Sequence, residues 1–153
     1  MSANKLLTCW TGVVLLFLFF VANPSQALGE DLKVEAILVW GTNDATSPNP
    51  KHKPVGPRLA KKLQSLPFKW ANYFEVNCKQ IVVPHSAEKK ERMSQDCEIK
   101  VKNLGKSVVE VSLIGKGEPV GKITQALPKG ELLVTGGNAE NFTAWFVVLK
   151  QVE

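Results

Sequence analysis

Short segments in which apolar and polar residues alternate make up most of the chain after residue 72. The alternation runs from Phe74 to Cys78 and again from Cys97 to Val101. A period of two is typical of strands that bury one face of an antiparallel sheet. Seven expected strands, some alternating and some apolar on both faces, and one helix predict a mainly β fold, a single antiparallel, sandwich-like domain. The strands are expected near residues 33–40, 73–83, 97–102, 108–114, 120–127, 131–135 and 142–150.

One short amphipathic helix is expected between the first two strands, at residues 57–66. Leu59, Leu63 and Leu66 recur at helical spacing and form an apolar stripe, with cationic residues off the stripe. The preceding residues, 41–57, contain many prolines and glycines, which indicates a flexible loop. An α+β fold is the alternative, because the two strands and this helix could form a β-α-β unit against an antiparallel sheet.

The two cysteines in the second half of the chain, Cys78 and Cys97, predict a disulfide on a β-hairpin. If the numbers of paired residues sum to 175, Cys78 lies opposite Cys97. The same register places Val76 opposite Ile99 and the turn near residues 87–88. One register therefore pairs the apolar residues on one face, aligns the two cysteines for a disulfide and puts the turn in a polar segment. A pair of cysteines in an exported chain is typical of a structural disulfide, and two buried thiols are the alternative.

The N-terminal residues predict export. A lysine precedes an apolar run of 17 residues at positions 6–22. Ser25 and Ala27 are small residues at the two positions that signal peptidase recognises, so residues 1–27 are expected to be a signal peptide. The mature chain would then be one β-rich domain, residues 28–153, which is periplasmic, envelope-associated or secreted and has no membrane span. Retention of the apolar run as an anchor is the alternative, because 17 residues is the lower limit of a spanning helix.

Charge is unevenly distributed along the chain. The formal charge is +5, and it falls to +4 without the signal peptide. Six cations and no acid lie between residues 51 and 69, so the rest of the mature chain carries a charge of −2. We interpret this stretch as a docking face for an anionic envelope component or another envelope protein, and a helix face that is only solvated is the alternative. The six cations are Lys51, Lys53, Arg58, Lys61, Lys62 and Lys69.

Two tryptophans, Trp40 and Trp70, flank the basic stretch. Packing in the core is the usual role of tryptophan. Two indoles at the ends of a basic loop could also line a carbohydrate or peptide groove. Nucleic acid is not expected as a partner, because the chain is exported and no aromatic residues interleave the cations.

No catalytic motif, metal site or cofactor is expected. The segment Gly115–Thr124 is similar to a phosphate-binding loop, but its glycines are one residue too far apart and Ile123 replaces the required Ser or Thr. The two histidines, His52 and His85, lie beside prolines and have no partners at the spacing of metal ligands. The carboxylates lie mostly at polar positions in strands, so solvated sheet faces explain them better than a hydrolytic pair.

Two runs of the sequence, Leu38–Asp44 and Leu63–Val76, resemble small exported bacterial proteins of no assigned activity. The resemblance would extend over most of the mature chain. It implies a bacterial protein of the envelope or a secreted one, and it carries over no functional residue.

These features together predict a non-enzymatic binding or structural module of the bacterial cell envelope. A subunit of an envelope assembly that acts by protein contacts is one alternative, and an exposed apolar strand edge would favour it. A carboxylate-based hydrolase is another, and a cleft with two converging carboxylates would favour it. A concave basic face with Trp40 or Trp70 exposed would favour ligand binding.

We expect the mature protein to begin at Leu28, because signal peptidase cleaves after a small residue such as Ala27. N-terminal sequencing of the exported protein measures this directly. A chain that still starts before Ala22 would show that the apolar run is retained as an anchor.

Overall fold

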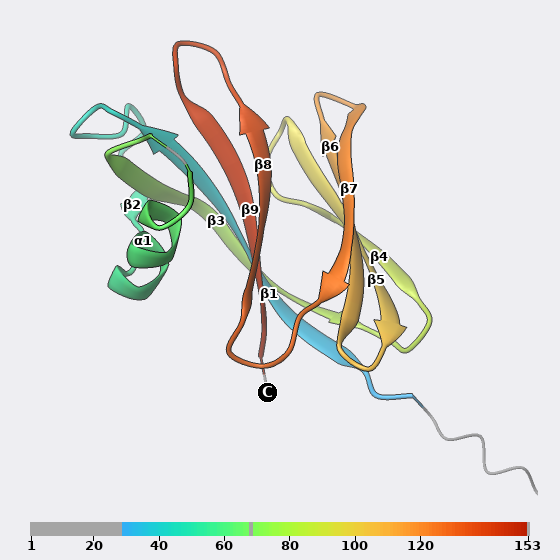
Figure 1. Cartoon of the computed structure of the whole chain (residues 1–153). Coiled ribbons are helices and arrows are strands. Elements are labelled where there is room, and N and C mark those ends of the chain that lie inside the picture. Colours follow the sequence, from blue (N-terminus) through green and yellow to red (C-terminus); the bar gives the residue numbers. More distant parts are fainter. Residues whose placement is uncertain (1–28, 68, 153) are drawn as a thin grey trace, which may run out of the picture.

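Two antiparallel sheets packed face to face form the protein in the computed structural model, which describes residues 29–67 and 69–152. The five-stranded sheet has the strand order β2-β3-β1-β9-β8, and the four-stranded sheet has the order β4-β5-β6-β7 (Figure 1). The mainly β fold predicted from the sequence is therefore confirmed, whereas the predicted signal peptide lies outside the described residues. The elements are β1 (Leu32–Thr42), β2 (Lys53–Pro54), α1 (Pro57–Gln64), β3 (Asn72–Val83), β4 (Glu88–Arg92), β5 (Cys97–Gly105), β6 (Val108–Gly115), β7 (Glu118–Ala126), β8 (Leu132–Asn138) and β9 (Ala144–Gln151).

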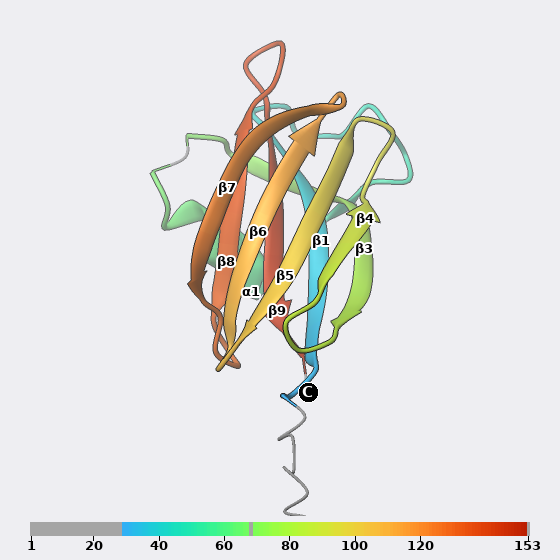
Figure 2. The ribbon, with the colours of Figure 1, turned by 90° about the vertical axis from the view of Figure 1, so that its right-hand side faces the viewer.

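The main core lies between the two sheets and is built from the inward-facing residues of the long strands. Strand alternation places Val34 of β1, Val111 of β6 and Val147 of β9 on this inner face, and all three are fully buried. Figure 2 shows the four-stranded sheet stacked in front of β8, β9 and β1. Each such side chain contributes roughly 1.5–3 kcal/mol to folding by leaving water, so this layer holds the two sheets together.

The helix α1 covers the outer face of the five-stranded sheet and builds a second, smaller core. It begins at Pro57, whose fixed φ suits the first turn, and it ends at Gln64, two residues earlier than expected. Leu63 is fully buried, and Leu59 and Leu66 are partly buried against the same cluster. The apolar stripe predicted from helical spacing is thus confirmed.

The order of the strands rules out the β-α-β alternative. β1 and β3, which flank α1 in the sequence, pair with each other directly and antiparallel, whereas a β-α-β crossover joins parallel strands. The last strand, β9, lies between β1 and β8. Its interior place agrees with its apolar character on both faces.

The predicted hairpin between residues 73–83 and 97–102 is wrong. β3 pairs with β1 and β2, and the chain then crosses to the other sheet, where residues 88–92 form the edge strand β4 instead of a turn. β5 pairs with β4 and β6. The alternation of apolar and polar residues predicts which side of a strand is buried, but it does not identify the neighbouring strand. Several strand pairings therefore agree with the same pattern.

The predicted disulfide between Cys78 and Cys97 is not formed, and both thiols are free. Cys78 lies opposite Ile37 and is exposed on the outer face of the five-stranded sheet. Cys97 lies opposite Gly115 and is only 5% exposed, between the two sheets. The two sulfur atoms thus lie on opposite sides of a sheet, and a disulfide would require the backbone to move.

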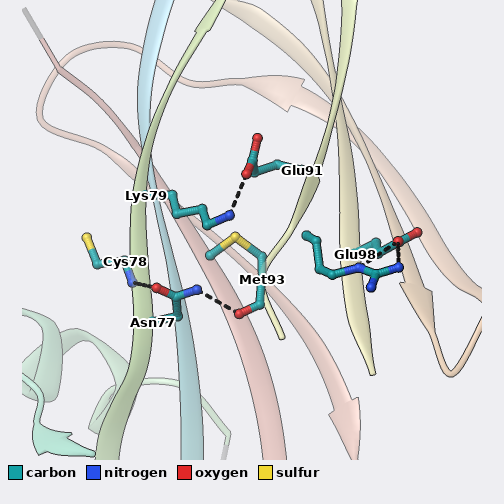
Figure 3. A network of polar contacts seen from close by, with 7 residues as sticks. Asn77, Cys78, Lys79, Glu91, Met93 and Glu98 are labelled. Atoms are coloured by element: carbon teal, nitrogen blue, oxygen red, sulfur yellow. Dashed lines mark hydrogen bonds and ion pairs between the residues drawn. The ribbon is translucent and has the colours of Figure 1, made fainter. Parts of the chain in front are cut away.

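Polar contacts from the other side of β3 tie the two sheets together. Lys79 Nζ forms an ion pair with Glu91 Oε1 of β4 at 2.6 Å, and Asn77 Nδ2 donates a hydrogen bond to the carbonyl oxygen of Met93 at 2.8 Å. Figure 3 shows that Cys78, between Asn77 and Lys79, points away from both contacts. These contacts position β4 at the edge where the chain passes from one sheet to the other.

The two cysteines should respond differently to substitution. Cys97→Ser is expected to lower the free energy of unfolding by about 1–3 kcal/mol, because it buries a hydroxyl group in apolar surroundings. Cys78→Ser, the matched control on the exposed face, should change it by less than about 0.5 kcal/mol. Chemical denaturation measures both values. Without reductant, a maleimide should label Cys78 in the native protein and both cysteines after unfolding, whereas labelling of neither in denaturant would mean that a disulfide exists.

Candidate functional site

A hollow opens between the two sheets at the end of the sandwich where β1 ends and β9 begins. Its volume is about 790 Å³. Trp40 of β1 and Trp145 of β9 line it from the five-stranded sheet, and Cys97 and Gly115 line it from the four-stranded sheet. Polar loop residues, among them Asp96, Lys116 and Glu140, form its rim. We call this cavity the end hollow.

Trp40 and Trp145 form an aromatic wall of the end hollow. They lie directly opposite each other on β1 and β9, so their side chains project from the same face of the sheet. Leu38 and Val147, two positions away on the two strands, belong to the core between the sheets, which identifies this face as the inner one. Both tryptophans are partly exposed. The core between the sheets therefore ends at two indoles that border open space.

Neighbouring rings hold Trp40 in place. Its ring centroid lies 6.0 Å from that of Phe74 and 6.4 Å from that of His52. The imidazole Nδ1 of His52 in turn lies 2.7 Å from Ser47 Oγ, within hydrogen-bond distance. A side chain that is already packed loses little conformational freedom when a ligand binds, so the wall is preorganised.

A glycine sets the width of the end hollow next to Trp145. A Cβ atom at Gly115 would lie 2.9 Å from Val120 Cγ2 and 3.6 Å from Trp145 Cζ2. A residue with a side chain would therefore displace Val120 or enter the space in front of the indole.

The loop between β8 and β9 forms one lip of the end hollow and has a strained backbone. Asn141 and Phe142 have φ values of 58° and 56°, a left-handed conformation that costs a non-glycine residue about 1–2 kcal/mol. Hydrogen bonds hold it in place: the Ala139 amide donates to the carbonyl of Thr143, and Trp70 Nε1 donates to the carbonyl of Phe142, both at 2.9 Å. The Phe142 side chain is 94% exposed. The same conformation occurs at Lys106 and Ser107 in the β5–β6 turn, so the feature that distinguishes the β8–β9 loop is its exposed aromatic ring.

An ion pair crosses the mouth of the end hollow. Lys116, in the turn between β6 and β7, places Nζ 3.6 Å from Oε1 of Glu140, in the β8–β9 loop. The two side chains are 73% and 85% exposed, and an ion pair so exposed contributes at most about 1 kcal/mol. Its significance is geometric, because it shows that loops from the two sheets meet above the cavity.

The two tryptophans that the sequence analysis selected, Trp40 and Trp70, lie on opposite faces of the five-stranded sheet. Trp70 packs edge-on against Phe146, with ring centroids 5.7 Å apart, in the cluster beneath α1. It lines a separate side hollow of about 550 Å³ that shares the β8–β9 loop with the end hollow. Trp145 cannot be recognised as the neighbour of Trp40 from the sequence, because that relation depends on the pairing of β1 with β9.

Cys97 borders the end hollow but is not an activated nucleophile. Burial, together with the negative charge of Glu98, raises the pKa of its thiol to about 11, so the sulfur is protonated at neutral pH. A thiolate would need a nearby cation or imidazolium to lower this pKa. Among residues 29–67 and 69–152, no group of three or more His, Cys, Asp and Glu side chains is placed to hold a metal ion.

The six cations of the basic stretch are all exposed, and within the described part of the chain none of them forms an ion pair. Arg58, Lys61 and Lys62 lie at helical spacing on α1, off the leucine stripe, and line a small hollow of about 300 Å³ together with Glu131. The Arg58 guanidinium also donates a hydrogen bond to the carbonyl of Gly130 at 2.9 Å. The structure therefore gathers three of the six cations on one helix face. The other three, Lys51, Lys53 and Lys69, lie in the segments before and after α1.

Comparisons with models of protein families, with curated proteins and with solved structures found no match for this chain. The resemblance to small exported bacterial proteins therefore stays a prediction. In the part of the chain that the structure describes, no helix has the length and apolar character needed to cross a membrane.

The strain at Phe142 can be measured. Phe142→Gly is expected to raise the free energy of unfolding by about 0.5–1 kcal/mol, because glycine adopts positive φ without steric cost and little apolar contact is lost at an exposed site. Phe142→Ala is the control, since alanine keeps the strain, and it should stay within about ±0.5 kcal/mol of the parent. Thermal or chemical denaturation measures both, and a loss above about 1 kcal/mol in either variant would contradict this loop conformation.

Proposed function

We propose that the mature chain is a non-enzymatic binding module of the bacterial cell envelope and that its ligand occupies the end hollow. The observation that carries the proposal is the pairing of Trp40 with Trp145 on the inner face of the sheet, where they border a cavity of about 790 Å³. Two apolar rings next to open space leave unburied surface that a ligand can cover.

The size and lining of the end hollow support this role. Ligand sites commonly have volumes of about 300–1,000 Å³ and combine an apolar wall with a few polar groups. Here the indoles supply the wall, and Asp96, Lys116 and Glu140 supply polar groups at the rim. The loops at the end of a β-sandwich are a frequent place for binding, because the sheets below keep them in position.

The chemistry of the rim favours binding over catalysis. Glu140 is 85% exposed and paired with Lys116, whereas a catalytic acid usually needs burial to raise its pKa toward neutrality. The high pKa of Cys97 disfavours nucleophilic attack by its thiol. These features support a site that holds its ligand without changing it.

The edge strand β7 gives little support to assembly by strand addition. It is mostly exposed, but it contains Pro119 and Lys122, and its register with β6 shifts between Leu113 and Ile114. Prolines, lysines and bulges are the features by which natural sheets prevent edge-to-edge pairing.

The basic helix face supports a second proposed role, attachment to an anionic envelope component. Several lysines elsewhere form ion pairs, for example Lys79 with Glu91 and Lys122 with Glu110. The helix cations Lys61 and Lys62 have no such partner within the described residues, so their charge is available to an external anion.

Blocking the end hollow should abolish ligand binding. Val120, which is 47% exposed, borders the hollow, so Val120→Trp is expected to fill its mouth. Leu104→Trp is the matched control, since Leu104 is 43% exposed on β5 and does not line the hollow. The measurement is a thermal-shift and tryptophan-fluorescence screen of the parent with aromatic fragments, oligosaccharides and short peptides. A hit should act on the parent and on Leu104→Trp but not on Val120→Trp, and the absence of any hit in the parent would contradict the proposal.

Removing cations from the basic stretch should weaken retention on anionic vesicles without changing stability. A variant with Lys53, Lys61, Lys62 and Lys69 changed to Gln should unfold like the parent, because exposed substitutions stay within about ±0.5 kcal/mol. Salt should weaken retention of the parent, because exposed charges are screened beyond about 8 Å at physiological ionic strength. The control variant removes the same charge through Lys33, Lys89, Lys102 and Lys106. Equal retention of both variants on phosphatidylglycerol vesicles at low salt would mean that the basic helix face is only solvated.

A further inference from the structure

We infer that the ligand is a neutral oligosaccharide that lies across the end of the sandwich, from the end hollow to Trp70. This inference rests on the proposed binding function and names the chemical class of the ligand.

Three hollows surround the β8–β9 loop and share lining residues. The end hollow adjoins an outer hollow of about 550 Å³ next to Trp40 and Asp44, and the side hollow next to Trp70 has the same volume. Asn141 and Thr143 line all three, so the hollows meet at this loop. We call the combined surface the aromatic groove. Its extent suits a chain of linked rings rather than one small molecule.

All three tryptophans of the described residues line the aromatic groove, although they come from different elements. One face of a pyranose ring carries C–H groups and is apolar, so sugar rings stack on aromatic side chains while their hydroxyl groups remain available for hydrogen bonds. Trp40 is fixed by its contact with Phe74, and Trp70 is fixed by its hydrogen bond to the carbonyl of Phe142. The stacking surfaces are thus in place before a ligand arrives, which lowers the entropic cost of binding.

The polar residues of the aromatic groove are suited to hydroxyl groups. Amide side chains of Asn43, Asn138 and Asn141 line it. An amide donates and accepts hydrogen bonds at once, as two adjacent sugar hydroxyls do. The carboxylates of Asp44 and Asp96 add acceptors for hydroxyl protons.

The charge of the aromatic groove favours a neutral ligand. Its acids, Asp44, Asp96 and Glu140, slightly outnumber its lysines, Lys69 and Lys116. An anionic polymer would meet no excess of cations here. The cations Arg58, Lys61 and Lys62 gather instead on α1, outside the groove. The two surfaces therefore recognise different chemistry.

The exposed ring of Phe142 gives the aromatic groove a further stacking surface at its outer lip. The ring is 94% exposed and borders the side hollow with Trp70. The ring makes no contribution to the core, so its surface is accessible to a ligand.

The test is isothermal titration of the exported protein with cellohexaose, xylohexaose, mannohexaose and chitohexaose, each compared with its disaccharide. At least one hexasaccharide should bind, and more tightly than its disaccharide, because each additional stacked ring is expected to improve affinity by about 3- to 10-fold. Phe142→Ala should weaken hexasaccharide binding by about the same factor and leave disaccharide binding unchanged. The control is Val82→Ala, since Val82 is an exposed apolar residue that does not line the groove, and it should bind like the parent.

Other outcomes would overturn the inference and separate it from the proposed function. Equal affinity for a hexasaccharide and its disaccharide, with no effect of Phe142→Ala, would confine the ligand to the end hollow. Binding of heparin oligosaccharides or of a proline-rich peptide, but of none of the neutral sugars, would show that the ligand is an anionic sugar or a peptide and not a neutral oligosaccharide. If no sugar binds, while an aromatic fragment binds the parent and not Val120→Trp, the assignment of an oligosaccharide ligand is wrong. The proposed binding function is then still supported. If no probe of any class binds, both are wrong.

Discussion

The rest of the structure depends on the central strands β1 and β9, because both of their faces are buried. Val147 faces the core between the sheets, whereas Val39 and Val148 face the cluster beneath α1. Their register also determines the candidate site, since it places Trp40 directly opposite Trp145 at the end of the inner face. A shift of one residue would turn one of the two indoles to the other side of the sheet and remove the aromatic wall.

The candidate site lies where this central packing stops. Along most of the sandwich, aliphatic side chains from the two sheets fill the space between them. At the end, Gly115 leaves room in front of Trp145, and the loop that carries Glu140 and Phe142 lies over the opening. In this loop Asn141 and Phe142 have positive φ values, and the exposed ring of Phe142 adds accessible aromatic surface rather than contacts in the core. The rigid sandwich holds this aromatic loop in position, as a binding scaffold requires.

The two proposed binding surfaces lie on different parts of the fold and carry different kinds of side chain. The aromatic groove has aromatic and amide side chains with little net charge, and it lies at the end of the sandwich. The basic helix face, with Arg58, Lys61 and Lys62, lies over the outer face of the five-stranded sheet. An exported protein with both surfaces would be held near an anionic envelope by long-range attraction and would keep a separate site for a neutral ligand.

The sequence by itself determined the class of fold and the buried side of α1, because alternation and helical spacing are local properties of the backbone. Leu63 lies in the core as its spacing predicted. The partners of the strands were decided only by the tertiary structure, because a period-two pattern is satisfied by any antiparallel neighbour. For that reason Cys78 and Cys97 were assigned to one hairpin and lie in different sheets, and the adjacency of Trp40 and Trp145 came only from the pairing of β1 with β9.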